Sequence, residues 1–175
     1  LNSFYDVRRT LLLSKSSLGS RPVDVGPVWL NRQLNEYNGN SISTLLIYYK
    51  GSYILEMLRM LMYDPQQKNP DARFIAMLRD FTSTYAGKNA STEDFRRMVE
   101  KHVGVSAEWF FEEWVYGSYT PTYDFSYQLS DAGTGQTEVS ISLTQSDVPE
   151  SFQMQLPLYI EANGEQRFVG RVPIT

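Results

Sequence analysis

Apolar residues recur at helical spacing over the first two thirds of the chain and alternate with polar residues over the last third. The change falls near Tyr119-Thr120-Pro121. Spacing of three and four residues is typical of helices that bury one face, and strict alternation is typical of strands. The pattern predicts an α+β fold: a helical bundle or solenoid over residues 1–118, then a small antiparallel, sandwich-like β-sheet over residues 119–175.

The most apolar segment, residues 44–63, predicts a central helix of about 20 residues, roughly 30 Å long. Asp64-Pro65 should end it, because a proline disfavours helical geometry in the residue before it. Further apolar residues widen its hydrophobic face, so other helices should enclose it. The positions expected on the main apolar face are Leu45, Tyr48, Tyr49, Ser52, Leu55, Leu58 and Met62.

Three shorter helices should follow. Asn69 is a suitable N-cap, with Pro70 in the first turn, for a helix that stops near Gly87. Ser91 begins the next, with two acidic residues in its first turn, and Gly104 ends it. A last helix covers residues 106–117. Residues 1–43 are less regular, with a short helix near residues 6–13, and should wrap the core.

Four strands are expected after Pro121. The alternating stretches are residues 123–127, 139–143, 152–158 and 168–172. Turn signals at residues 131–133, 147–149 and 163–164 separate them, the last being Asn163-Gly164. One face of the resulting sheet should lie on a core.

Composition narrows the function. The chain has 175 residues, 42% of them hydrophobic and 14% aromatic, which is enough to fill a core. Its formal charge of −4 is dispersed, which excludes a basic surface for nucleic acid. Lys50, Glu56 and Arg59 interrupt the longest apolar run, which excludes a membrane span there. No targeting signal opens the chain at Leu1, so its localisation stays open.

Two sets of residues form an ordered succession. The first is Tyr48-Tyr49-Lys50-Gly51 followed by Tyr53-Ile54-Leu55-Glu56-Met57-Leu58-Arg59. The second is Asp94-Phe95, Glu100, Gly104, Trp109-Phe110-Phe111, Trp114, Pro121 and Tyr123. In order and spacing they resemble the segment just downstream of the metal-binding helix in zinc aminopeptidases of the alanyl aminopeptidase (gluzincin) family. The resemblance covers about residues 28–175.

The resemblance gives Tyr48 a catalytic role. In that family the tyrosine at this position donates its phenol to the oxygen of the tetrahedral intermediate, while zinc polarises the same carbonyl. Phenols titrate near pH 10 in general, so at pH 7 they keep the proton that such a donor needs. The alternative is that Tyr48 is one of twelve tyrosines, packed in the core. Tyr49 takes the role if the register shifts by one, about 100° around the helix.

The zinc ligands are expected upstream of Leu1. The chain has one histidine and no cysteine, and it lacks the H-E-x-x-H motif. Trp29-Leu30-Asn31 is similar to the stretch that carries the family's third ligand, but Arg32 stands where a glutamate is required. Arg32 and Glu36 also lie too close to Tyr48 in sequence. We therefore expect no metal or cofactor site in this chain, and His102 should pack beside Val103.

The other conspicuous residues have structural interpretations. Gly51 is expected to allow close packing, and Lys50 to be a solvated or carbonyl-capping cation. The aromatic residues Phe110, Phe111 and Trp114 should pack against a neighbouring helix. Glu112 and Glu113 should lie on a solvated face.

These inferences lead to a main hypothesis and two rivals. The chain would be part of a zinc aminopeptidase that removes N-terminal residues from peptides. Its partners would be the peptide substrate and the upstream catalytic half of the same protein, and alone it would be inactive. The first rival is a non-catalytic relative that serves as a protein-interaction scaffold. The second is an unrelated helical domain joined through residues 118–121 to an immunoglobulin-like module, which a fully enclosed Tyr48 would favour.

Overall fold

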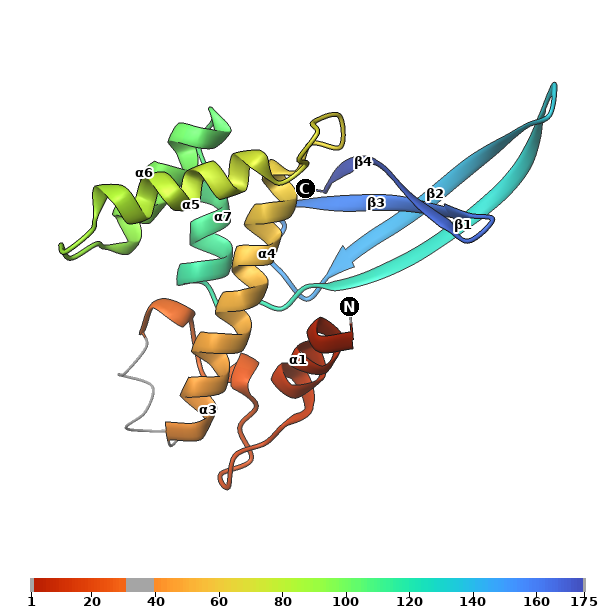
Figure 1. The fold of residues 1–175 in the computed structure, drawn as a ribbon. Coiled ribbons are helices and arrows are strands. Elements are labelled where there is room, and N and C mark those ends of the chain that lie inside the picture. The colour runs from red at the N-terminus through yellow and green to blue at the C-terminus, as the bar shows by residue number, and fades with distance from the viewer. Residues whose placement is uncertain (1, 31–39, 175) are drawn as a thin grey trace.

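The computed structural model describes residues 2–30 and 40–174. Helices gather on one side of the molecule, and two long hairpins extend from the other (Figure 1). The predicted α+β class is confirmed. None of the helices in these residues combines the length and apolarity needed to cross a membrane.

A continuous helical column runs through the middle of the helical side. It consists of α3 (Asn40–Leu45), a π-helical turn η3 (Leu46–Lys50) and α4 (Gly51–Met62), which follow one another without a break (Figure 1). The backbone becomes extended at Tyr63, directly before Asp64-Pro65. The predicted central helix and its end are therefore confirmed, whereas the π-helical turn was not predicted.

The buried face of this column differs from the expected one. Tyr48 and Leu55 were expected on the apolar face, yet both are exposed. The buried positions recur every four residues, because the column packs along the row of side chains that this spacing aligns. They are Ile42, Leu46, Lys50, Ile54, Leu58 and Met62, and Ser43 beside Ile42 is buried as well.

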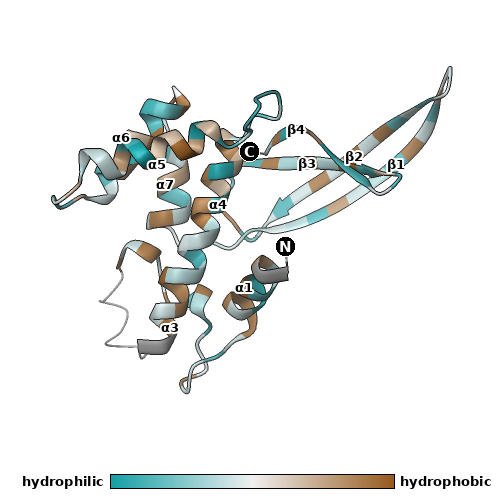
Figure 2. Ribbon diagram, viewed as in Figure 1, coloured by the Kyte–Doolittle hydropathy of each residue, from teal (hydrophilic) through white to brown (hydrophobic). Residues whose placement is uncertain are grey.

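Four helical elements pack around α4: α5 (Ala72–Thr84), α6 (Thr92–Val103), α7 (Glu108–Phe111) and a second π-helical turn, η4 (Glu112–Tyr116). Apolar residues concentrate where these elements meet (Figure 2). Phe110 and Phe111 are buried in this core, as expected from the sequence. The other buried members are Ile54, Leu58, Met62, Met77, Met98, Val99, Ala107 and Val115.

The helix ends follow the predicted capping chemistry with one shift. Ser91 Oγ accepts from the Asp94 amide, and the Asp94 carboxylate accepts from the Ser91 amide, forming a capping box. Gly104 ends α6 with a left-handed φ of 86°. Asn69 is not the N-cap of α5, which begins after Asp71. Its side chain instead accepts from the Asp71 amide at 3.2 Å in the preceding turn.

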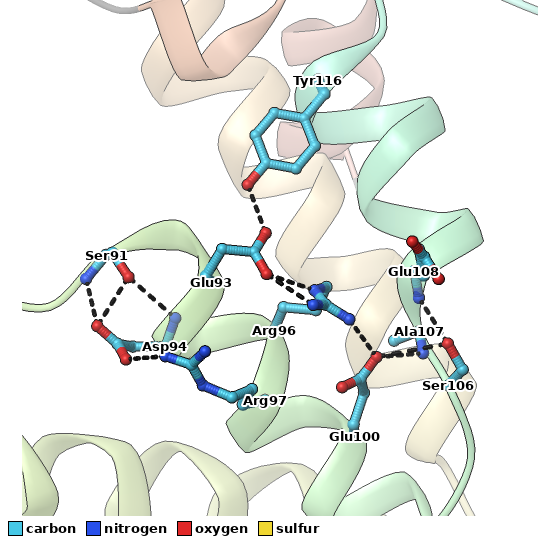
Figure 3. A network of polar contacts seen from close by, with 10 residues as sticks. All are labelled: Ser91, Glu93, Asp94, Arg96, Arg97, Glu100, Ser106, Ala107, Glu108 and Tyr116. Carbon is cyan, nitrogen blue, oxygen red and sulfur yellow. Dashed lines mark hydrogen bonds and ion pairs between the residues drawn. The ribbon is translucent and has the colours of Figure 1, made fainter.

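A charged network ties α6 to α7 and η4 (Figure 3). Arg96 bridges Glu93 and Glu100, and Glu93 accepts from the Tyr116 phenol at 2.8 Å. Glu100 also accepts from the Ala107 amide at 3.0 Å, at the start of α7. A carboxylate at a helix start satisfies an otherwise unpaired amide, so this network fixes the angle between the two helices.

The N-terminal segment lies against the column, as expected. It contains α1 (Asn2–Leu13) and a short 3-10 turn, η1 (Pro22–Asp24). The rings of Phe4 and Tyr53 meet edge to face at 5.3 Å, and the Tyr53 phenol donates to the Phe4 carbonyl. Leu11 and Pro22 are buried.

The strands form two separate antiparallel hairpins. β1 (Thr122–Gly133) pairs with β2 (Gln136–Ser146), and β3 (Met154–Ala162) pairs with β4 (Glu165–Ile174). Asn163-Gly164 makes the second turn, with positive φ at both residues, as predicted. The first turn lies at Thr134-Gly135, after a register shift in β1, and not at residues 131–133.

One face of the first hairpin is apolar and uncovered. Phe125, Tyr127 and Leu129 are 51%, 60% and 63% exposed, and they pair across the hairpin with Leu143, Ile141 and Val139. Apolar bands alternate with polar ones along this hairpin (Figure 2). The expectation that the sheet lies with one face on a core is therefore wrong for the outer part of β1 and β2, because the hairpin extends away from the helices (Figure 1).

Arg171 of β4 fastens the second hairpin to the end of α4. Its guanidinium donates to the Met60 carbonyl at 2.9 Å from Nε and at 2.5 Å from Nη2, and to the Tyr63 carbonyl at 2.5 Å. Tyr63 and Phe168 meet edge to face beside it, at 5.5 Å. Carbonyls at a helix end have no partner within the helix, so a cation placed there stabilises both elements.

Replacing Arg171 with methionine should lower the free energy of unfolding by about 1.5–3 kcal/mol, because charged hydrogen bonds to two helix-end carbonyls are lost. Urea denaturation measures the change. Arg167→Met is the matched control, since this exposed arginine of the same strand forms an exposed ion pair with Glu165, and its loss should cost less than about 0.5 kcal/mol. Equal effects of the two variants would contradict the role of Arg171.

Candidate functional site

Tyr48 lies at the surface of the π-helical turn η3. Its side chain is 71% exposed, and its hydroxyl has no hydrogen-bond partner among residues 2–30 and 40–174. The exposure was not expected from the apolar pattern, but it leaves the phenol accessible to a ligand. An enclosed Tyr48 would have favoured the interpretation as a helical domain joined to an immunoglobulin-like module. Tyr48 is not enclosed.

The π-helical turn determines how neighbouring side chains diverge. Such turns insert an extra residue into a helix and are frequent at functional sites. Side chains two positions apart point to roughly opposite sides of a helical turn, so Tyr48 and Lys50 lie on opposite sides. Tyr49, the alternative if the register shifts, is half-buried, and its carbonyl accepts from Ser52 Oγ at 2.8 Å.

Lys50 is directed inward. Only 7% of it is exposed, and its Nζ donates to the Gly117 carbonyl at 3.3 Å, just after η4. Burial disfavours the ammonium ion and lowers the pKa of Lys50 to about 8. Of the two interpretations of Lys50, carbonyl capping is confirmed and a solvated cation is wrong. Lys50 is thus a direct link between the two π-helical turns.

The backbone at Gly117 is tightly packed. A β-carbon there would lie 2.6 Å from the Glu113 carbonyl oxygen and 2.9 Å from that of Glu112. A β-carbon at Gly51 would meet no atom of the described residues within 4 Å, apart from its chain neighbours and the backbone of its own helix. The expectation that Gly51 allows close packing is therefore wrong, and Gly117 has that role, because the chain turns back over the end of η4.

Glu113 and its neighbours join the helices to the strands. Glu113 Oε1 accepts from the Gln153 amide at 2.7 Å, and the Trp114 and Phe152 rings meet at 5.5 Å. Burial raises the pKa of Glu113. Burial and the nearby Glu113 charge raise the pKa of Tyr123 to about 12. Glu112 is exposed as expected, but Glu113 is not on a solvated face, since it caps the start of the segment that leads into β3.

The residues present do not form a zinc site. In the described ranges, no three His, Cys, Asp or Glu side chains gather so as to hold a metal ion. His102 lies 3.0 Å from Asp80, through Nε2, and Lys101 shares the same carboxylate oxygen at 2.6 Å. Asn31, Arg32 and Glu36, which were considered for the third ligand, lie outside the described residues.

An apolar cavity of about 190 Å³ lies between α4, α7 and β3. Its one carboxylate, Glu56, is bound by Arg59 at 2.6 Å. Tyr48 is not among the residues that line it, so the cavity and the phenol are separate features. The lining residues are Tyr53, Glu56, Met57, Met60, Leu61, Trp109, Phe110, Met154, Gln155 and Pro157.

A scan against protein-family models finds no match for the chain, and a search of curated proteins finds no relative.

The two glycines should respond oppositely to alanine. Gly117→Ala should lower the free energy of unfolding by about 1–3 kcal/mol, because the new methyl group overlaps two carbonyl oxygens. Gly51→Ala should raise it by about 0.5–1 kcal/mol, because alanine favours the helix and the space is open. Urea denaturation of both variants measures these changes, and a destabilised Gly51→Ala protein would show that Gly51 is the packed position after all.

Lys50 should make stability depend on pH. Its ordinary pKa of 10.5 applies to the unfolded chain and about 8 to the folded chain, so between these values the unfolded chain holds an extra proton. Stability therefore rises with pH across this window, by up to about 1.4 kcal/mol per pH unit. Below pH 8 Lys50 is protonated in both the folded and the unfolded chain. Its contribution to the free energy of unfolding is smallest there, because the full cost of burying the ammonium ion is present.

The measurement is urea denaturation of the wild type and Lys50→Met at pH 7, 8, 9 and 10. The difference between the two proteins isolates Lys50, because the tyrosines titrate alike in both. Above pH 8 we expect the free energy of unfolding of the wild type to rise relative to that of Lys50→Met. A constant difference would mean that Lys50 titrates as a solvated lysine.

Proposed function

We propose that the chain is part of a zinc aminopeptidase, in which Tyr48 donates a hydrogen bond to the substrate oxygen that becomes negatively charged. The zinc ligands would come from residues upstream of Leu1, since those described here offer no set of ligands. The substrate would be a peptide with a free N-terminus. This chain alone would hydrolyse nothing.

The observation that carries the proposal is the exposure of Tyr48. A phenol can stabilise an oxyanion only if its O–H reaches the substrate, and 71% of this side chain is free for such a contact. A tyrosine on the buried face could not take this role. The π-helical turn adds support, because such irregularities are frequent at functional sites.

The chemistry asked of Tyr48 is limited. A phenol O–H that points at the developing oxyanion strengthens its hydrogen bond as charge accumulates, so it favours the transition state over the bound substrate. Removing one such donor typically costs about 3 kcal/mol in the barrier. The rigid helical column that carries Tyr48 favours a fixed direction for the donor, which this effect requires.

A protein-interaction scaffold is the second candidate. The observation that favours it is the uncovered apolar face of β1 and β2, built around Phe125, Tyr127 and Leu129. Contiguous exposed apolar surface is typical of binding sites for other proteins. A scaffold of this kind would keep the fold without needing the Tyr48 hydroxyl.

The test is Tyr48→Phe in the longer enzyme that the proposal requires. Its kcat for an aminoacyl chromogenic substrate should fall about a hundredfold or more, because the oxyanion donor is lost. Zinc content and melting temperature should stay unchanged, because the hydroxyl has no partner in the described part of the chain. Tyr49→Phe is the matched control, one residue away on the half-buried side, and should keep its activity.

Wild-type turnover in Tyr48→Phe would remove the catalytic role. Loss of activity in Tyr49→Phe alone would show that the register of the motif is shifted by one residue.

A further inference from the structure

We propose that Lys50 is a positioning residue, whose bond to the Gly117 carbonyl holds Tyr48 facing outward. The catalytic meaning of this inference rests on the function proposed above, but its structural content does not. Lys50 would not touch the substrate. It would act by fixing the rotation of the turn that carries Tyr48.

The rotation follows from the two side chains being two positions apart. Since they point to roughly opposite sides of the turn, drawing Lys50 into the interior turns Tyr48 toward solvent. The observed burial matches this division, with 7% of Lys50 and 71% of Tyr48 exposed. Leu46, one turn before Lys50, and Ile54, one turn after it, are also buried. The column therefore presents the same face to the interior before and after Lys50.

The acceptor of this bond is held firmly. A β-carbon at Gly117 would overlap the carbonyl oxygens of Glu112 and Glu113, so the backbone there lies close against the end of η4. The preceding residue, Tyr116, is bound through its phenol to Glu93 and stacks edge to face on Trp29 at 5.9 Å. A fixed carbonyl can therefore determine where the end of the Lys50 side chain lies.

The chemistry of lysine also favours a directing role. Burying an ammonium ion costs free energy, and an apolar residue of similar length would fill the same space without that cost. No ion pair involving Lys50 occurs in residues 2–30 and 40–174, so its buried contact is the directional bond to a backbone oxygen. A directional bond specifies rotation, whereas apolar packing alone permits small rotations.

The experiment uses the 175-residue chain and dye-sensitised polarisation of tyrosine rings in NMR, which reports side chains accessible to the dye. Tyr48→Phe identifies the Tyr48 signal. Lys50→Met keeps the length of the side chain and removes its donor, so the turn can rotate slightly and the Tyr48 signal should lose a measurable part of its polarisation. Lys50→Arg restores a cationic donor and should restore the signal.

Lys88→Met is the matched control. Lys88 is an exposed lysine that also donates to a helix-end carbonyl, that of Thr84 at 3.2 Å, but it is far from Tyr48 in sequence. Its replacement should leave the Tyr48 signal unchanged. If Lys50→Met does not fold, Lys50→Leu, which also lacks a donor and fills less of the space, is compared with Lys50→Arg in its place. A folded variant without a donor at position 50 that keeps the wild-type Tyr48 signal would overturn the inference.

A second readout separates this inference from the proposed function. In the longer enzyme, Lys50→Met should lower kcat by roughly tenfold to a hundredfold with KM retained, and Lys50→Arg should recover it. If Tyr48→Phe leaves turnover intact, the proposed function fails, while the polarisation result still decides the role of Lys50. If Tyr48→Phe is inactive and Lys50→Met is fully active, the positioning role fails and the function stands.

Discussion

The ammonium group of Lys50 places a charge inside the molecule, and the surrounding backbone has to accommodate it. A buried cation without a partner is costly, so the Gly117 carbonyl must remain within reach of Nζ. This requirement ties the π-helical turn in the central column to the end of the second π-helical turn. The contact joins the column to the end of η4 beside the apolar core, and we infer that the outward direction of Tyr48 depends on it.

The same kind of interaction recurs where the strands meet the helices. Arg171 donates to the carbonyls of Met60 and Tyr63 at the end of α4, as Lys50 does to Gly117 after η4. Conversely, a carboxylate serves as acceptor before β3, where Glu113 accepts a hydrogen bond from the Gln153 amide. Helix ends leave backbone groups unpaired, and here side chains from distant parts of the chain satisfy them. These contacts, together with the packing of Phe152, connect the helical and β parts.

Local chemistry made much of the fold predictable. The helix start at Ser91, the helix end at Gly104 and the Asn163-Gly164 turn depend on residues within a few positions of one another, and each was expected from the sequence. The central helix was also expected. The π-helical turn η3 within it was not, because its extra residue has no local sequence signal. The buried face of the column was consequently misassigned at Tyr48 and Leu55.

The candidate site was predictable only in part. The sequence identified Tyr48 through a resemblance, but its exposure depends on the rotation of the column. The burial of Lys50 ran against the usual behaviour of lysine and needed the distant Gly117 to explain it. Gly51 and Gly117 look alike in sequence, and only the path of the chain around η4 shows which one is packed. Likewise, alternation in β1 and β2 predicts an apolar face but not what covers it.

The most direct test of this account is an NMR titration of the Lys50 side chain, followed through its Cε resonance in selectively labelled protein. Burial of Nζ destabilises the ammonium form and predicts a midpoint at about pH 8. A midpoint near the ordinary value of 10.5 would show that Lys50 is solvated. In that case the link between the two π-helical turns, and the reason given for the direction of Tyr48, would both be contradicted.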